Sequence, residues 1–182
     1  LEPSCHSMFI DDYRQLRLPG ADAVAERCFS FEQFAAKAAA EGRLQLRLPS
    51  GETHVAIHAH CHAKALTDVR AMKRAAQALT NAQVTLLDTA CCGMAGAYGM
   101  LKSNYDLSLQ VAEPILEAIR ALPEGTHLVA SGTSCRHQVQ DLLIGGELPR
   151  RFRGLYFGRA FPQSSLPGRG NAVFAVHESA VD

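Results

Sequence analysis

The chain of 182 residues has no excess of charge of either sign, because 18 basic residues balance 18 acidic ones. This balance gives no electrostatic attraction for nucleic acid or for an anionic membrane surface. The chain also lacks any apolar run close to the ~20 residues of a transmembrane helix. Its N-terminus lacks the basic and then apolar segments of a signal peptide. We expect a cytoplasmic protein that meets the inner face of a membrane only through partners.

Cysteine is also too scarce for a disulfide scaffold, with six cysteines in a chain of this length. Without a secretion signal, cysteines in such numbers favour metal binding or redox chemistry in a reducing compartment. The hydrophobic fraction of 47% and the charged fraction of 20% fit the core of an ordinary folded domain. The first residue is Leu1, and we expect the chain to be part of a larger protein.

From residue 54 onward, short apolar runs alternate with stretches that carry apolar residues at helical spacing. We predict Thr67 as the N-cap of the first of these helices. The alternation predicts an α/β fold, in which a parallel sheet carries helices on both faces in Rossmann-like βαβ units. The predicted strands are 54–58, 83–87 and 126–130, and the predicted helices are 68–79, 104–122 and 135–144.

The two ends of the chain have other patterns. Near the N-terminus, a helical pattern follows Pro3, two more lie at 22–29 and 31–40, and alternation at 44–48 suggests an edge strand. The C-terminal end is rich in proline, glycine and arginine, with one possible strand at 172–176. We therefore divide the chain into a helical segment (1–53), a central α/β domain (54–146) and an irregular tail (147–182).

Four cysteines follow the carboxyl ends of the three predicted strands. Cys61 follows the first strand, Cys91 and Cys92 follow the second, and Cys135 follows the third. The carboxyl ends of parallel strands share one edge of the sheet, where ligands gather. Cys135 also opens a helix, whose dipole stabilises a thiolate. We therefore predict that these four side chains converge on a metal centre.

Thiolates in this number select zinc, copper(I) or an iron–sulfur centre. A structural zinc site normally uses pairs of cysteines spaced two to four residues apart. The adjacent pair and the three separate strand ends favour a larger inorganic cluster, with a structural zinc domain as the alternative.

The other cysteine and histidine positions have simpler interpretations. Cys28 is interpreted as a small hydrophobe. Ordinary polar roles are predicted for His6, His54, His127, His137 and His177.

Other residues are candidates to line the bound group. Gly93 and Gly96 allow backbone to approach it closely. We expect His60 and His62, which flank Cys61, to hydrogen-bond cluster sulfur or backbone rather than to bind metal. Arg136 follows Cys135 directly and is a further candidate.

Three segments resemble the cysteine-rich CCG domain: 60–62 (HCH), 88–96 (DTACCGMAG) and 134–138 (SCRHQ). That domain occurs in heterodisulfide reductase and in the iron–sulfur subunits of glycolate oxidase and anaerobic glycerol-3-phosphate dehydrogenase. It also occurs in fused FAD-linked oxidase/iron–sulfur proteins. The start of the chain at 2–5 (EPSC), together with 31–32 (FE) and 93–96 (GMAG), is most similar to the C-terminal part of the fused type. The resemblance covers roughly residues 1–145.

The resemblance implies that Cys61, Cys91, Cys92 and Cys135 bind an iron–sulfur cluster. Gly132 stands where the family has a further cysteine, so four thiolates remain, which suits a 4Fe–4S cluster. The resemblance also implies that residues 1–53 end an upstream CCG repeat. The last ligand of that repeat would be the cysteine of segment 2–5 (EPSC).

In function, the resemblance implies electron transfer within an oxidoreductase. FAD on another domain or subunit would oxidise a 2-hydroxy acid such as D-lactate, glycolate or D-2-hydroxyglutarate. A ferredoxin-like iron–sulfur domain and the cluster held here would pass the electrons to a quinone or another carrier. This chain alone would then lack dehydrogenase activity. Two alternatives stay open: thiol–disulfide chemistry at the cluster, as in heterodisulfide reductase, and a non-catalytic zinc-binding domain.

Overall fold

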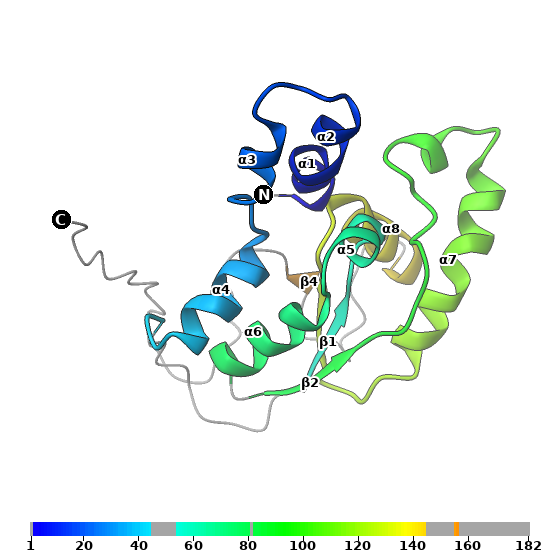
Figure 1. Cartoon of the computed structure of the whole chain (residues 1–182). Helices are drawn as coiled ribbons and strands as arrows, with labels where there is room; N and C mark the ends of the chain where they lie inside the picture. Colours follow the sequence, from blue (N-terminus) through cyan, green and yellow to red (C-terminus); the bar gives the residue numbers. More distant parts are fainter. Residues whose placement is uncertain (1, 45–53, 81, 145–154, 157–182) are drawn as a thin grey trace.

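The computed structural model describes residues 2–44, 54–80, 82–144 and 155–156 (Figure 1). At its centre is a sheet of parallel strands in the order β2-β1-β3-β4. The fold is α/β with a helical N-terminal segment, which confirms the predicted class. The strands are β1 (His54–His58), β2 (Gln83–Leu86), β3 (His127–Ala130) and the short β4 (Leu155–Tyr156).

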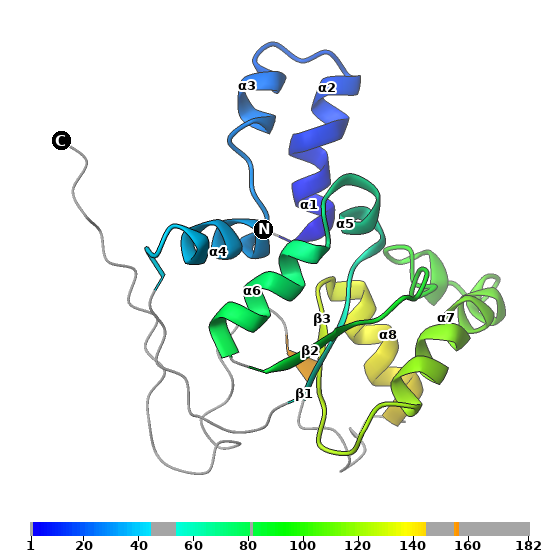
Figure 2. The ribbon, with the colours of Figure 1, turned by 60° about the horizontal axis from the view of Figure 1, so that its bottom comes forward.

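Helices cover both faces of the sheet, as predicted (Figure 2). Successive side chains of a strand point to opposite faces, so the central strand β1 contributes to two cores. Val55 and Ile57 pack with Met72 on one face, whereas Ala56 packs with Ile115 on the other. The helices of the first face are α5 (Cys61–Leu66) and α6 (Arg70–Thr80), and those of the second are α7 (Tyr105–Arg120) and α8 (Thr133–Ile144).

The strand order reverses at β1. From β1 the chain passes to β2 on one side and then to β3 on the other side. The helices that follow β1 and β3 lie on opposite faces of the sheet. In open α/β sheets, ligands bind outside the carboxyl ends of the strands at such a reversal. The fold therefore places the candidate site where β1 and β3 end.

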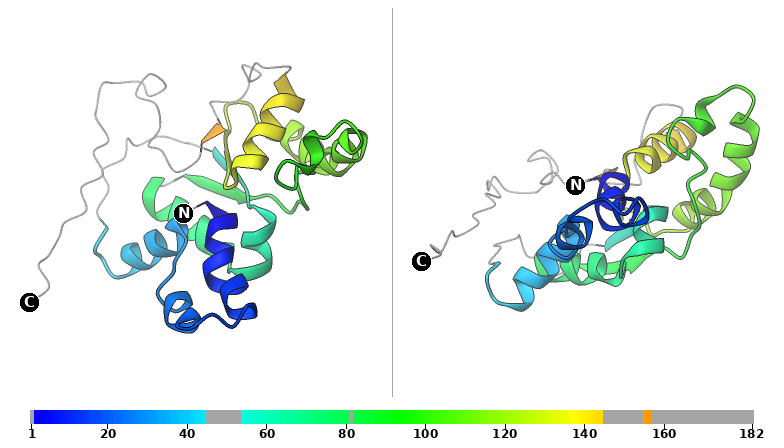
Figure 3. Two further views of the ribbon diagram at one scale, coloured as in Figure 1. Left: turned by 90° about the horizontal axis from the view of Figure 1, so that it is seen from above. Right: turned by 45° about the horizontal axis from the view of Figure 1, so that its top comes forward.

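The N-terminal segment is helical, as predicted, and its helices lie on the α5–α6 side of the molecule (Figure 3). Helix α1 packs on α5, and α4 packs on α6. A capping box begins α4, because Ser30 and Gln33 each accept the other's backbone N–H. The elements are α1 (Pro3–Ser7), η1 (Met8–Asp12), α2 (Tyr13–Gln15), α3 (Ala21–Ala25) and α4 (Phe31–Ala40).

The prediction that Thr67 caps α6 is wrong. Asp68 performs this role, since its carboxylate accepts the backbone N–H of Arg70 at 3.0 Å. Thr67 instead closes the short helix α5, where its hydroxyl donates to the carbonyl of Ala63 at 2.7 Å. The sequence pattern did not predict α5, because six residues are too few to show a helical period.

Other boundaries differ by a few residues. The helix predicted at 22–29 ends at Ala25, and the one predicted at 135–144 begins at Thr133. Strand β4 lies inside the segment predicted to be an irregular tail. Most of the strand predicted at 44–48, all of the one predicted at 172–176 and the remainder of the tail lie outside the described residues. No helix in the described part of the chain is long and apolar enough to cross a membrane.

Candidate metal centre

The four predicted cysteines lie beyond the carboxyl ends of three neighbouring strands. Cys61 is the first residue of α5, which follows β1. Cys91 and Cys92 belong to the loop after β2, and Cys135 lies in the first turn of α8, which follows β3. All four are free thiols; Cys92 and Cys135 are buried, and the other two are half-buried. The fold thus brings together four residues that span 75 positions of the sequence (135 − 61 + 1).

The four thiols also interact with one another. A hydrogen bond with Cys135, helped by the backbone N–H of Met94, lowers the pKa of Cys92 to about 6 despite its burial. The same thiol pair raises the pKa of Cys135 far above its ordinary value. Burial, and next the charge of Cys91, raises the pKa of Cys61. The four sulfur atoms therefore share one electrostatic environment.

Four thiols this close cannot all ionise alone, because each thiolate raises the pKa of its neighbours. A bound metal centre supplies the missing positive charge and displaces the thiol protons. Within the described ranges, no three His, Cys, Asp or Glu side chains are placed to hold a single metal ion. The cysteines are therefore not preformed as the tetrahedral site of a lone zinc ion.

The loop that carries the cysteine pair rests directly on α7. Gly93 has a φ of +87°, and a Cβ atom there would lie 2.2 Å from the carbonyl oxygen of Ser108. A Cβ atom on Gly99 would lie 2.5 Å from the Ser108 hydroxyl. The backbone N–H of Gly93 donates to the sulfur of Cys91 at 3.4 Å. Only glycine fits at Gly93, where both the φ angle and the contact exclude a side chain.

Ser108 also connects this loop to the helix of Cys135. Its hydroxyl accepts a buried hydrogen bond of 2.8 Å from the side-chain amide of Gln138, which lies one turn after Cys135 on α8. The loop, α7 and α8 are thereby fixed relative to one another. Gly96 has a φ of +69° and open space around its Cβ position, so its requirement is conformational rather than steric.

His60 orders the start of α5. As N-cap of that helix, its Nδ1 accepts the backbone N–H of His62 at 3.2 Å, and Nδ1 lies 3.9 Å from the sulfur of Cys61. Its own backbone N–H donates to the hydroxyl of Ser131 at 2.7 Å. His60 therefore contacts both backbone and a candidate ligand sulfur.

Gly132 lies against the His60 ring. A Cβ atom at this position would lie 2.1 Å from Cδ2 of His60. We expect Gly132→Ala to destabilise the folded chain by about 1–3 kcal/mol, the usual cost of overpacking a close contact. Urea unfolding of the variant and the wild type measures the difference.

The matched control for Gly132→Ala is a double-mutant cycle with His60→Ala. Because that change removes the ring that the new methyl group meets, Gly132→Ala should cost much less in the His60→Ala background. Equal costs in the two backgrounds would show that the ring contact is not the cause.

Two other predicted lining residues hydrogen-bond to side chains outside the cysteine group. Nδ1 of His62 is hydrogen-bonded to the hydroxyl of Ser7 at 3.1 Å, which joins the start of α5 to α1. Arg136 donates from Nη2 to the hydroxyl of Thr133 at 3.1 Å. These contacts fix the first turns of α5 and α8, where two of the cysteines lie.

Two further residues reach the site that the sequence pattern did not assign to it. His58, at the end of β1, is 1% exposed and hydrogen-bonds through Nδ1 to Thr89 at 2.9 Å. Burial lowers the pKa of His58 to about 4, so the ring is neutral. Its Nε2 has no hydrogen-bond partner among the described residues, and a bound group could satisfy this buried nitrogen.

Lys64 is the second residue at the site that the sequence pattern did not assign to it. It lies one turn after Cys61 on α5 and donates to the backbone carbonyls of Thr89 and Ala90, the latter at 3.2 Å. Those two residues immediately precede the cysteine pair. Helical spacing from Cys61 would have indicated Lys64, but only if α5 had been recognised as a helix.

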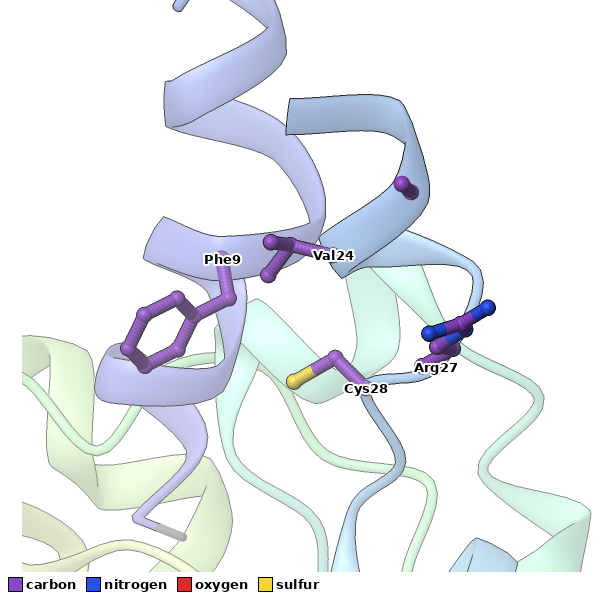
Figure 4. A pocket seen from close by; sticks show the side chains of 5 residues that line it. Phe9, Val24, Arg27 and Cys28 are labelled. Atoms are coloured by element: carbon purple, nitrogen blue, oxygen red, sulfur yellow. The ribbon is translucent and has the colours of Figure 1, made fainter. Parts of the chain in front are cut away.

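The other two cysteines lie outside this group. The sulfur of Cys28 points toward Phe9 and Val24 in a pocket of the N-terminal helices (Figure 4). This surrounding suits the interpretation of Cys28 as a small hydrophobe. Its carbonyl is hydrogen-bonded to the ring of His6 at 3.3 Å. Cys5 is exposed on α1.

Comparison with known proteins gives a partial match. No family model and no solved structure matches the chain. Curated relatives include one subunit of the anaerobic glycerol-3-phosphate dehydrogenase, from Escherichia coli strain K12 and from strain O157:H7, each 29% identical over 87 residues. The matched region is 47% of this chain, and it spans only 22% of each relative.

The chain is thus similar to a subunit of an oxidoreductase. This finding confirms the predicted resemblance in its coarse form, since that resemblance includes the same dehydrogenase. The finer likeness to the fused FAD-linked type stays a prediction.

Proposed function

We propose that this chain is an iron–sulfur electron-transfer module of a dehydrogenase. The observation that carries the proposal is that four free cysteines follow three neighbouring strand ends and shift one another's pKa values. Four thiolates complete the coordination of a 4Fe–4S cluster. The residues that would hold it are Cys61, Cys91, Cys92 and Cys135.

The donor set suits a cluster better than a single ion. The adjacent pair and the separate strand ends differ from the cysteine pairs, spaced two to four residues apart, of a structural zinc site, whereas a cluster takes one thiolate for each of several irons. The backbone amides of Gly93 and Met94 donate to the sulfurs of Cys91 and Cys92. Hydrogen bonds to ligand sulfur are one means by which a protein sets the potential of a cluster.

The relatives are subunits of a dehydrogenase, which supports a dehydrogenase domain or subunit as the partner of this chain. We propose that FAD on that partner oxidises a small alcohol, with 2-hydroxy acids as the first class to test. When bound, the cluster supplies one-electron transfer between the flavin side and an acceptor such as a quinone. This chain then binds and orients the cluster, and it excludes water from two of the ligand sulfurs.

A redox cycle tests this role. The anaerobically reconstituted chain is reduced with dithionite and then mixed with a soluble quinone such as menadione. We expect the sulfur-to-iron absorbance to bleach and then to return, while D-lactate or glycolate without a flavin partner leaves it unchanged. The chain without added iron and sulfide is the control. Absorbance that dithionite does not change would contradict the proposal.

Thiol–disulfide chemistry is the second candidate, and the low pKa of Cys92 favours it. Against it, Cys92 is only 4% exposed, and this burial disfavours direct attack by Cys92 on a disulfide substrate. An assay of disulfide reduction with reduced viologen as electron donor separates the two functions. Electron transfer to quinone without disulfide reduction is the result we expect.

A further inference from the structure

We infer that Lys64 is a positioning residue of the candidate metal centre. Its ammonium group fastens the cysteine-pair loop to α5 and supplies a fixed positive charge beside the ligand thiolates. This role rests on the proposed iron–sulfur function and deepens it, because it assigns a residue that tunes the centre without binding iron.

The Lys64 side chain links α5 to the loop that carries the cysteine pair. The Lys64 side chain leaves α5 one turn after Cys61 and donates to two successive carbonyls, those of Thr89 and Ala90. The next residue along the chain is Cys91. One side chain therefore bridges the helix of one ligand and the loop of two others. A lysine ammonium has three donors, so it can hold both carbonyls at once.

Lys64 also interacts electrostatically with an acidic side chain and the cysteines around it. Burial lowers the pKa of this half-buried amine, whereas Cys135, Asp88 and Cys61 raise it. Cys91 acts in the same direction. The ammonium thus interacts with cysteines that come from all three strand ends. Ionised thiols around it favour its charged form, and it favours theirs.

The position and the charge of Lys64 together should affect the reduction potential of the centre. Reduction adds one negative charge to a centre that already carries four thiolates. A cation held on the carbonyl of the residue before Cys91 stabilises the reduced state more than the oxidised state, and a half-buried setting screens this effect less than bulk water does. Removing the charge should therefore make the centre harder to reduce.

Lys64→Met separates charge from packing, because methionine retains an unbranched apolar stem. Lys64→Arg retains the positive charge and is the conservative variant. Lys73→Met makes the same chemical change at an exposed position of α6 and is the matched control. All variants are made in the full chain and reconstituted under identical conditions.

The first readout is the midpoint potential of the reconstituted centre. For Lys64→Met we expect about a tenfold loss in the equilibrium constant for one-electron reduction, equivalent to a potential about 59 mV more negative. Lys64→Arg should restore most of the potential, and Lys73→Met should match the wild type. A potential in Lys64→Met equal to that of the wild type would overturn the electrostatic role.

The second readout is hydrogen exchange of residues 88–92 in the iron-free chain. Lys64→Met should exchange about tenfold faster there, because the loop loses its attachment to α5. Unchanged exchange would overturn the positioning role. Should Lys64→Met take up no iron, normal uptake by Lys64→Arg supports the inference, and loss in both variants contradicts it. If the wild type binds no iron, the proposed function fails, while exchange still decides whether Lys64 holds the loop.

Discussion

Replacing Cys92 with serine should abolish cluster binding, with the iron content falling from about four atoms per chain to almost none. Cys92 is buried in the core between the sheet and α7, and its thiol pairs with that of Cys135. Serine has nearly the same shape, so the fold should persist. Its hydroxyl is a poor substitute for a soft thiolate ligand. Iron and acid-labile sulfide analysis after anaerobic reconstitution measures the loss.

Cys28→Ser is the control for this loss, since it makes the same atomic change outside the site. Cys28 lines the pocket beside Phe9 and Val24 among the N-terminal helices. The control variant should retain its iron, and Cys135→Ser should lose it as Cys92→Ser does. Full iron content in Cys92→Ser would show that this residue is not a ligand.

Gly93→Ala should destabilise the iron-free chain by about 2–5 kcal/mol. Two costs add: a residue with a side chain in the left-handed region loses roughly 1–2 kcal/mol, and overpacking costs about 1–3 kcal/mol. The atom that the new methyl group would meet is the backbone oxygen of Ser108 at 2.2 Å, which no rotation of a side chain can move away. Chemical denaturation measures the change in the free energy of unfolding.

Gly96→Ala separates these two costs. Gly96 also has a positive φ, +69°, but a Cβ atom there meets nothing within 4 Å. It should therefore show only the conformational cost of about 1–2 kcal/mol. The difference between the two variants then measures the contact with α7. Equal losses would contradict the close packing of the cysteine-pair loop on Ser108.

The sheet and its long helices were predictable because their apolar patterns are long enough to show a period. Helix α7 was predicted although Pro114 lies inside it, since Ile115 and Ile119 recur at helical spacing and are buried. Helix α5 was not predictable in this way, because it contains fewer than two turns. Strand β4 has two residues and carries no alternation at all.

The sequence predicted several lining residues of the candidate site, such as His60 and Gly93, but its main prediction was the set of four cysteines. Their positions after successive strands, together with the rule for parallel sheets, suffice to bring them together. The contacts that hold them depend on α5 and on loop conformation. Lysine is ordinarily found at solvent-exposed positions, so the sequence gives no sign that Lys64 belongs to the site. Its bond to the carbonyls before Cys91 appears only when helix and loop are placed in space.

Electron paramagnetic resonance of the reconstituted, dithionite-reduced chain, combined with iron and sulfide analysis, tests the central claim most directly. The four converging thiols predict about four irons and four sulfides per chain and a signal of a reduced four-iron cluster. A chain that binds no iron after anaerobic reconstitution, or that binds a single zinc ion through the same cysteines instead, would contradict an iron–sulfur function.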